Sequence, residues 1–236
     1  MFILFKKIKN FIKYAHLFED FILYCIFYDI KKGFYIDVGA NDPNIDSVTK
    51  AFYIRGWNGI NIEPLPIQYK SLLKYRKRDI NLNIGAGNKR ENATLYLGGQ
   101  ESTTKKEFIK KKKNFINIEI HTMKDICIKY IPKNLDIQFV KIDVEGGERD
   151  VLLGYDFENY RPKVFCIEAT KPSTLIPTHQ LWEEILLKNN YSFAYQYDVN
   201  RYYIENTAIN FKKRFNNLDI LIKQFKEYNL KKKQKK

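Results

Sequence analysis

Four short apolar runs each end in an acidic residue, and these acids are the residues most able to do chemistry. The runs end at Asp37, Glu63, Asp143 and Glu168. In an open sheet of parallel strands, ligands bind at the carboxyl ends of the strands, so the four carboxylates should gather along one edge. Each acid alone could equally cap the helix that follows its strand. Four acids in equivalent places favour a binding site.

The chemistry of these acids suits a cationic ligand with several hydroxyl groups. S-adenosylmethionine carries a sulfonium, an amino group and a ribose diol, and one carboxylate can accept hydrogen bonds from both diol oxygens. In the turn after the first run, Gly39 would let the backbone approach a ligand closely. The turn is not a GxGxxG phosphate cradle, because Asn41 and Pro43 stand where further glycines are expected. The pattern therefore favours a cofactor without phosphates over a nicotinamide dinucleotide.

A second group of charges lies around the third acid. Lys141, Asp143 and Glu145 share one face if the strand continues through them. A strand buried on both sides is normally apolar, so three charges indicate a reaction centre or, alternatively, a buried ion pair. His179 has a suitable intrinsic pKa for proton transfer, although it opens a predicted helix and could simply cap or pack there.

The elements that must position these residues follow an alternating pattern. From Gly33 onward, short apolar runs alternate with segments of helical period, which is typical of βα units feeding a mostly parallel sheet. After Pro177, aromatic strands over 191–197 and 202–205 predict an antiparallel hairpin. The stretch 92–122 breaks the rhythm and predicts an extra β excursion with a mobile loop. The predicted strands are Phe34 to Val38, Gly59 to Glu63, Asp79 to Ile84, Ile137 to Val144 and Lys163 to Glu168.

The two ends of the chain have a different residue pattern from its centre. Residues 2–30 predict one or two amphipathic helices, which could pack on the domain or rest on an anionic membrane surface. The longest apolar run there is far shorter than the ~20 residues that cross a bilayer. We therefore predict an N-terminal helical arm over 1–32, one α/β domain over 33–210 and a basic C-terminal helix or tail over 211–236.

The amino-acid composition is compatible with several classes of binding partner and does not select one. The chain has 236 residues, 44% of them hydrophobic, which suits a single core and a single active site. A net charge of +14 would suit nucleic acid, an anionic membrane or an acidic glycan, but runs of lysine are usually solvated. Three widely spaced cysteines argue against a disulfide framework and a thiolate zinc site, and predict a cytoplasmic location.

Taken in order along the chain, these motifs resemble the FkbM family of methyltransferases. The resemblance runs from about Tyr14 to Phe215. It implies a Rossmann-like, seven-stranded class I methyltransferase sheet, mostly parallel with one antiparallel strand, and O-methylation of sugars or polyketide-type alcohols with S-adenosylmethionine as donor. The blocks that carry it are Tyr14-Ala15, Phe18-Glu19-Asp20, Phe34 to Asn41, Gly56 to Pro64, Lys141 to Glu148, Val151 to Phe157, Ile167 to Thr170, Pro177 to Glu183 and Asn200 to Tyr203.

The resemblance also implies roles for individual residues. Asp37, Gly39 and Asn41 would form the cofactor loop, Glu63 would hold the ribose hydroxyls, and Asp143 would lie beside the methionine end and the acceptor. Many relatives have Gly where this chain has Pro43, and some have Gln where it has His16. The remaining assignments are Asp143, Glu145 and His179 as candidate catalytic residues, with Glu168, Arg201 and Tyr202 as candidate acceptor contacts.

The sequence thus predicts a methyltransferase that acts on a hydroxyl group, with a carbohydrate, free or lipid-linked, as the expected acceptor. No residue is assigned as a dedicated metal ligand, although acids this close could bind Mg²⁺ or Ca²⁺ to orient sugar hydroxyls. Two alternatives stay open. A nucleic-acid methyltransferase would explain the basic charge, but the chain has no NPPY-type motif and no Pro-Cys pair. A non-catalytic, membrane-associated glycan-binding module is the other.

Overall fold

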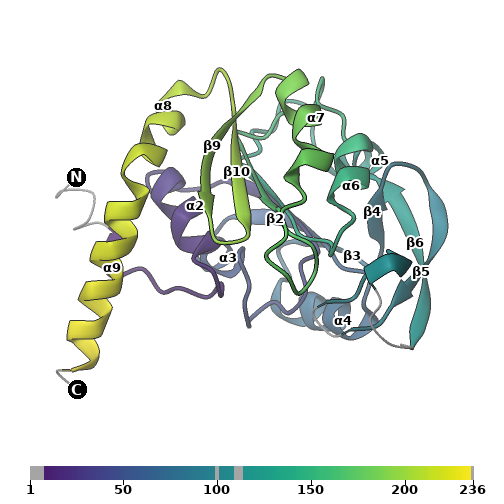
Figure 1. Ribbon diagram of the computed structural model, residues 1–236, viewed down its shortest axis with the longest axis horizontal. Helices are drawn as coiled ribbons and strands as arrows, with labels where there is room; N and C mark the ends of the chain where they lie inside the picture. The colour runs from purple at the N-terminus through teal and green to yellow at the C-terminus, as the bar shows by residue number, and fades with distance from the viewer. Residues whose placement is uncertain (1–7, 99–100, 109–113, 235–236) are drawn as a thin grey trace.

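A seven-stranded sheet forms the centre of the protein (Figure 1). The computed structural model describes residues 8–98, 101–108 and 114–234. The strand order is β3-β2-β1-β7-β8-β10-β9, and β10 alone runs antiparallel to its neighbours. This is the predicted Rossmann-like class I methyltransferase sheet. The strands are β1 (Phe34–Val38), β2 (Asn58–Ile62), β3 (Ile80–Leu82), β7 (Phe139–Ile142), β8 (Val164–Glu168), β9 (Tyr191–Tyr197) and β10 (Asn200–Glu205).

Helices cover both faces of the sheet because every central strand is buried on both sides. Successive side chains point to opposite faces, so Tyr35 joins one hydrophobic cluster and Ile36 the other. The first cluster includes α2 (Glu19–Phe27), α3 (Lys50–Ile54) and α9 (Leu218–Lys233); the second includes α5 (Met123–Tyr130), α6 (Glu148–Leu153) and α7 (Glu183–Lys188). The remaining helices are α4 (Pro66–Tyr75) and α8 (Ile209–Lys212), with 3₁₀ segments η1 (Lys106–Phe108), η2 (His179–Leu181) and η3 (Lys213–Asn217).

The N-terminal helix α2 is part of the core. Eight of its nine residues are buried, and Phe21 stacks on Phe225 of α9 with ring centroids 4.3 Å apart. A helix that is apolar on every side belongs in a protein interior. Of the two alternatives for residues 2–30, packing on the domain is therefore confirmed for α2, although this helix is buried all round rather than amphipathic; residues 1–7 lie outside the described part. The predicted basic C-terminal segment does form a helix, α9 (Figure 1).

The stretch 92–122, which interrupts the alternation of predicted strands and helices, forms most of a second sheet of three strands. Its order is β4-β6-β5, with β4 at Gly85–Gly87, β6 at Phe115–Thr122 and β5 at Glu91–Tyr96. This confirms the extra β excursion and divides the strand expected over 79–84, because the chain leaves the main sheet after Leu82. Leu95, Ile118 and Ile120 form the apolar cluster of the small sheet. The predicted mobile loop falls partly on 99–100 and 109–113, outside the described residues.

Within the described ranges, no helix is both long enough and apolar enough to cross a bilayer. The three cysteines are buried and unpaired.

The loop after β1 crosses the end of β7 at Gly39. Its φ is +79°, and a Cβ placed there would lie 1.9 Å from the carbonyl oxygen of Asp143. Gly39 N donates to Ile62 O at 3.0 Å, while Asp143 N donates to Val38 O at 3.1 Å. A glycine is therefore required here for two reasons. The two loops could not cross with a side chain present, and the backbone is in the left-handed region.

We predict that Gly39→Ala destabilises the fold more than Gly56→Ala. Gly56 has a φ of +90°, but a Cβ there would meet no atom within 4 Å. Both variants incur the left-handed backbone penalty of roughly 1–2 kcal/mol. Gly39→Ala should lose about 1–3 kcal/mol more through the collision with Asp143. Urea unfolding followed by circular dichroism measures the difference, and equal losses would contradict the crossing argument.

Candidate active site

A cavity of about 250 Å³ opens at the carboxyl ends of β1, β2, β7 and β8. The small sheet supplies an apolar wall through Leu95, Ile118 and Ile120. The N-terminal segment from His16 to Glu19 and the turn at Val199 and Asn200 line it elsewhere. The predicted gathering of acids at one sheet edge is confirmed, because all four strand-end acids line this cavity: Asp37, Glu63, Asp143 and Glu168.

Glu63 fixes the loop that follows β1. Its Oε2 accepts a hydrogen bond from Asn41 N at 2.7 Å, and its Oε1 accepts one from Leu65 N at 2.8 Å. Asn41 has a φ of +48°, which turns its N–H toward Glu63. Burial raises the pKa of Glu63. Each carboxylate oxygen has a further lone pair, so Glu63 is anchored and can still accept hydrogen bonds from a ligand.

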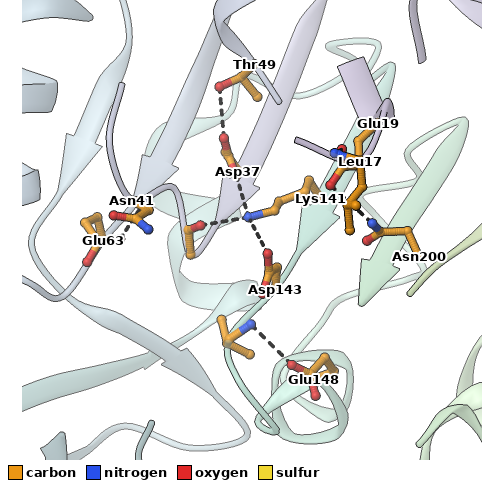
Figure 2. A network of polar contacts seen from close by, with 12 residues as sticks. Leu17, Glu19, Asp37, Asn41, Thr49, Glu63, Lys141, Asp143, Glu148 and Asn200 are labelled. Carbon is orange, nitrogen blue, oxygen red and sulfur yellow. Dashed lines mark hydrogen bonds and ion pairs between the residues drawn. The ribbon is translucent and has the colours of Figure 1, made fainter. Parts of the chain in front are cut away.

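Lys141 lies at the centre of a polar network (Figure 2). Its Nζ donates to Gly39 O at 2.8 Å and lies 3.5 Å from Asp37 Oδ1 and 3.3 Å from Asp143 Oδ2. The other oxygen of Asp37 accepts a hydrogen bond from Thr49 Oγ1 at 2.9 Å. The alternative of a buried ion pair is therefore confirmed, and because the pair lines the cavity a reaction centre here stays a prediction.

Three acids, one of them the Lys141 partner Asp143, meet at the carboxyl ends of β7 and β8. Asp143, Glu145 and Glu168 each offer an oxygen within 4.8 Å of the others. Burial and then the charge of Asp143 raise the pKa of Glu145 to about 8 and that of Glu168 to about 10. One buried oxygen of Glu145 and one of Glu168 accept no hydrogen bond from the described residues. These carboxyls can therefore hold protons near neutral pH or receive hydrogen bonds from a ligand.

Glu148 shapes the loop that carries Glu145. Its Oε1 accepts hydrogen bonds from Val144 N at 3.2 Å and Gly146 N at 3.0 Å. Burial raises its pKa to about 7. Glu145 and Gly146 have φ values of +54° and +96°, so the chain turns sharply there instead of extending the strand. Glu148 was not among the expected site residues, although it lies in the block of the resemblance that ends with it.

The N-terminal segment supplies a wall of the cavity that the sequence did not predict. His16, Leu17 and Glu19 line the cavity, with His16 exposed at its edge. Glu19 accepts hydrogen bonds from Leu17 N at 2.9 Å and from Asn200 Nδ2 at 3.2 Å, linking the segment before α2 to the start of β10 (Figure 2). The available signal was the block Phe18-Glu19-Asp20, whose acids had no assigned role.

Three expected site residues lie outside the cavity lining. His179 begins η2, and burial followed by Arg201 lowers its pKa. The guanidinium of Arg201 contacts Glu183 at 2.8 Å and donates to Tyr203 Oη at 2.8 Å. Tyr202 is fully buried in the core on the α2 face of the sheet. Tyr202 is fully buried and so cannot contact an acceptor, whereas His179 as base and Arg201 as acceptor contact stay predictions that this cavity does not support.

Comparison with known proteins now identifies the family. The family model described as Methyltransferase FkbM domain matches residues 37–193.

The chain belongs to the FkbM methyltransferase family.

The matched range of this FkbM methyltransferase contains the cavity acids from Asp37 to Glu168, while the wall at His16 to Glu19 precedes it. No curated protein sequence matches the chain. Among solved structures, precorrin-6y C5,15-methyltransferase from Geobacter metallireducens GS-15 is similar, with 12% identity and a TM-score of 0.38. That likeness covers 79% of this chain and 85% of the other.

The raised pKa of Glu168 predicts a pH-dependent cost to the fold of this FkbM methyltransferase. Between the ordinary value of 4.5 and about 10, the folded chain holds a proton on Glu168 that the unfolded chain has released. Stability therefore falls as pH rises through this window. Glu168→Gln cannot ionise at this position and so lacks this loss of stability. The difference in free energy of unfolding between Glu168→Gln and wild type should therefore grow in favour of the variant as pH rises, by at most about 1.4 kcal/mol per pH unit.

Urea unfolding at pH 5.5, 6.5, 7.5 and 8.5 measures this effect. Glu158→Gln is the matched control because Glu158 is exposed, and its stability curve should parallel that of wild type. A Glu168→Gln curve that also parallels wild type would show that Glu168 ionises normally in the folded protein.

Proposed function

We propose that this methyltransferase transfers a methyl group from S-adenosylmethionine to a hydroxyl group of a carbohydrate. The main support for this proposal is the charge of the cavity. Its described lining includes one lysine, Lys141, against a larger set of acids. That excess of negative charge suits a ligand that is cationic and rich in hydroxyls. The acids are Glu19, Asp37, Asp46, Glu63, Asp143, Glu145 and Glu168.

The residues present fit S-adenosylmethionine group by group. Glu63 is held by two backbone N–H groups and has lone pairs left for a ribose diol. Ile62, Ile118 and Ile120 offer apolar surface for a purine ring. Asp37 and Asp143 provide carboxylates for an amino group and a sulfonium. When bound, this cofactor supplies an activated methyl group on sulfur.

The proposed work of the protein is to align the acceptor and remove one proton. Methyl transfer is an in-line displacement, so positioning supplies much of the rate and a base completes it. Glu145 is the base we favour, because its pKa of about 8 is close to neutrality and one of its oxygens accepts no hydrogen bond from the described residues. Asp143 is held toward Lys141 and is better placed to orient than to deprotonate.

A carbohydrate fits the acceptor side better than a nucleic acid does. Glu19, Glu168 and Asn200 line the cavity and can exchange hydrogen bonds with the hydroxyls of a sugar. Asp37 and Asp143 share the single Lys141 ammonium of the described lining, so the cavity keeps a net negative charge that would repel a phosphate backbone. Linkage of the acceptor to a lipid, contact with an anionic membrane, a cytoplasmic location and use of a divalent cation stay predictions.

We predict that calorimetric titration gives micromolar binding of S-adenosylmethionine to the wild-type protein. Glu63→Gln should weaken binding at least about tenfold, because hydrogen bonds to a charged group contribute about 1.5–3 kcal/mol. Glu91→Gln, at an exposed acid outside the cavity lining, should bind like wild type. Absence of binding by folded wild-type protein would overturn the proposal and favour a non-catalytic glycan-binding module.

The acceptor class needs its own measurement. Cofactor labelled in the methyl group should transfer label to a hydroxyl of a carbohydrate extract and leave added RNA unlabelled. Label in RNA, together with RNA binding that weakens steeply with salt, would favour the nucleic-acid alternative.

A further inference from the structure

We propose that Lys141 is a positioning residue whose ammonium keeps Asp37 and Asp143 charged side by side and fixes the carbonyl of Gly39, so that the site receives a cationic cofactor. The inference rests on the proposed function. It concerns how the cavity holds its charge rather than which group reacts.

The position of Lys141 follows from strand pairing. β1 and β7 are parallel neighbours, and Asp37 is the register partner of Lys141. Partners in adjacent parallel strands point to the same face, so the carboxylate and the ammonium are brought together by the sheet itself. Lys141 is 8% exposed, and its three contacts reach the strand β1, the loop after β1 and the end of β7.

A lysine at this position needs a reason beyond stability. Apolar residues of similar volume often replace buried ion pairs with no loss of stability. Cys166, the register partner of Lys141 on β8, is uncharged and fully buried. The lysine instead lies where two carboxylates meet at a ligand cavity, which is where a fixed cation can control their charge.

The surroundings of Lys141 are strongly acidic. Burial lowers its pKa, but Asp143 and Asp37 more than offset this and raise the pKa above its usual value. The groups that face it are Glu19 from α2, Asp37 from β1, Glu63 after β2, and Asp143 and Glu145 after β7, with the Cys166 thiol on β8. One ammonium therefore offsets part of the charge and leaves a net negative site.

Removing the ammonium should change how the site responds to pH. In Lys141→Met, Asp37 and Asp143 would face each other without a cation between them. Burial and mutual repulsion would disfavour two adjacent charges without a cation, so that one of the two carboxyls takes up a proton as pH falls. A protonated acid no longer attracts a sulfonium or an ammonium, and affinity for the cofactor should drop with it.

The experiment is calorimetric titration of S-adenosylmethionine into Lys141→Met and Lys141→Arg between pH 5.5 and 7.5. Lys141→Arg keeps the charge and shares every other titrating group. The ratio of the two dissociation constants should grow as pH falls, approaching tenfold per pH unit once the extra proton binds. A constant ratio would overturn the inference, whereas failure of wild-type protein to bind would instead overturn the proposed function.

A double variant keeps the test decisive if Lys141→Met does not fold. Lys141→Met with Asp143→Asn removes the repulsion along with the ammonium. Recovery of folding in the double variant, measured by thermal unfolding without cofactor, would support an electrostatic role. If neither variant folds while Lys141→Arg does, Lys141 serves packing of the sheet and the inference fails.

Discussion

The pairing of β1 with β7 is the interaction on which the rest of the site depends. Backbone hydrogen bonds set the register, and the register places Asp37 beside Lys141. The loops that leave these strands cross where Gly39 meets Asp143. Glu63 then holds the first loop from the neighbouring strand through Asn41 N. The acidic part of the cavity is consequently a product of the central sheet, and the small sheet and the N-terminal segment complete its walls.

The N-terminal segment joins this arrangement through the hydrophobic core. Asp20 accepts hydrogen bonds from the backbone N–H groups of Tyr14, Ala15 and Phe21, which folds the chain back ahead of α2. Burial raises the pKa of Asp20 to about 7, so these three bonds hold a carboxyl that is costly to charge. Because α2 packs between the sheet and α9, Glu19 is delivered to the cavity by elements far from it in sequence.

Much of the fold and half of the site could be predicted from residue patterns. Short apolar runs ending in acids specify parallel strands, and parallel strands end at one edge, so Asp37, Glu63, Asp143 and Glu168 had to meet. The face of β10 could not be predicted, because Tyr202 and Tyr203 are chemically alike and differ only in which cluster they join. Glu19 and Glu148 were missed for another reason: their roles depend on tertiary contacts and on backbone N–H groups rather than on spacing.

The net charge of the whole chain does not indicate the charge that a ligand meets in the cavity. The chain carries +14, yet acids dominate the lining of its cavity. Exposed lysines are screened beyond about a Debye length, whereas buried carboxylates act over short distances in a medium of lower dielectric constant. A ligand in the cavity therefore meets an acidic surface even though the whole molecule is basic. The choice of acceptor therefore depends on the cavity itself, where Glu145 and Glu168 can exchange hydrogen bonds with hydroxyl groups and the excess of acids over the single Lys141 of the described lining disfavours phosphate groups.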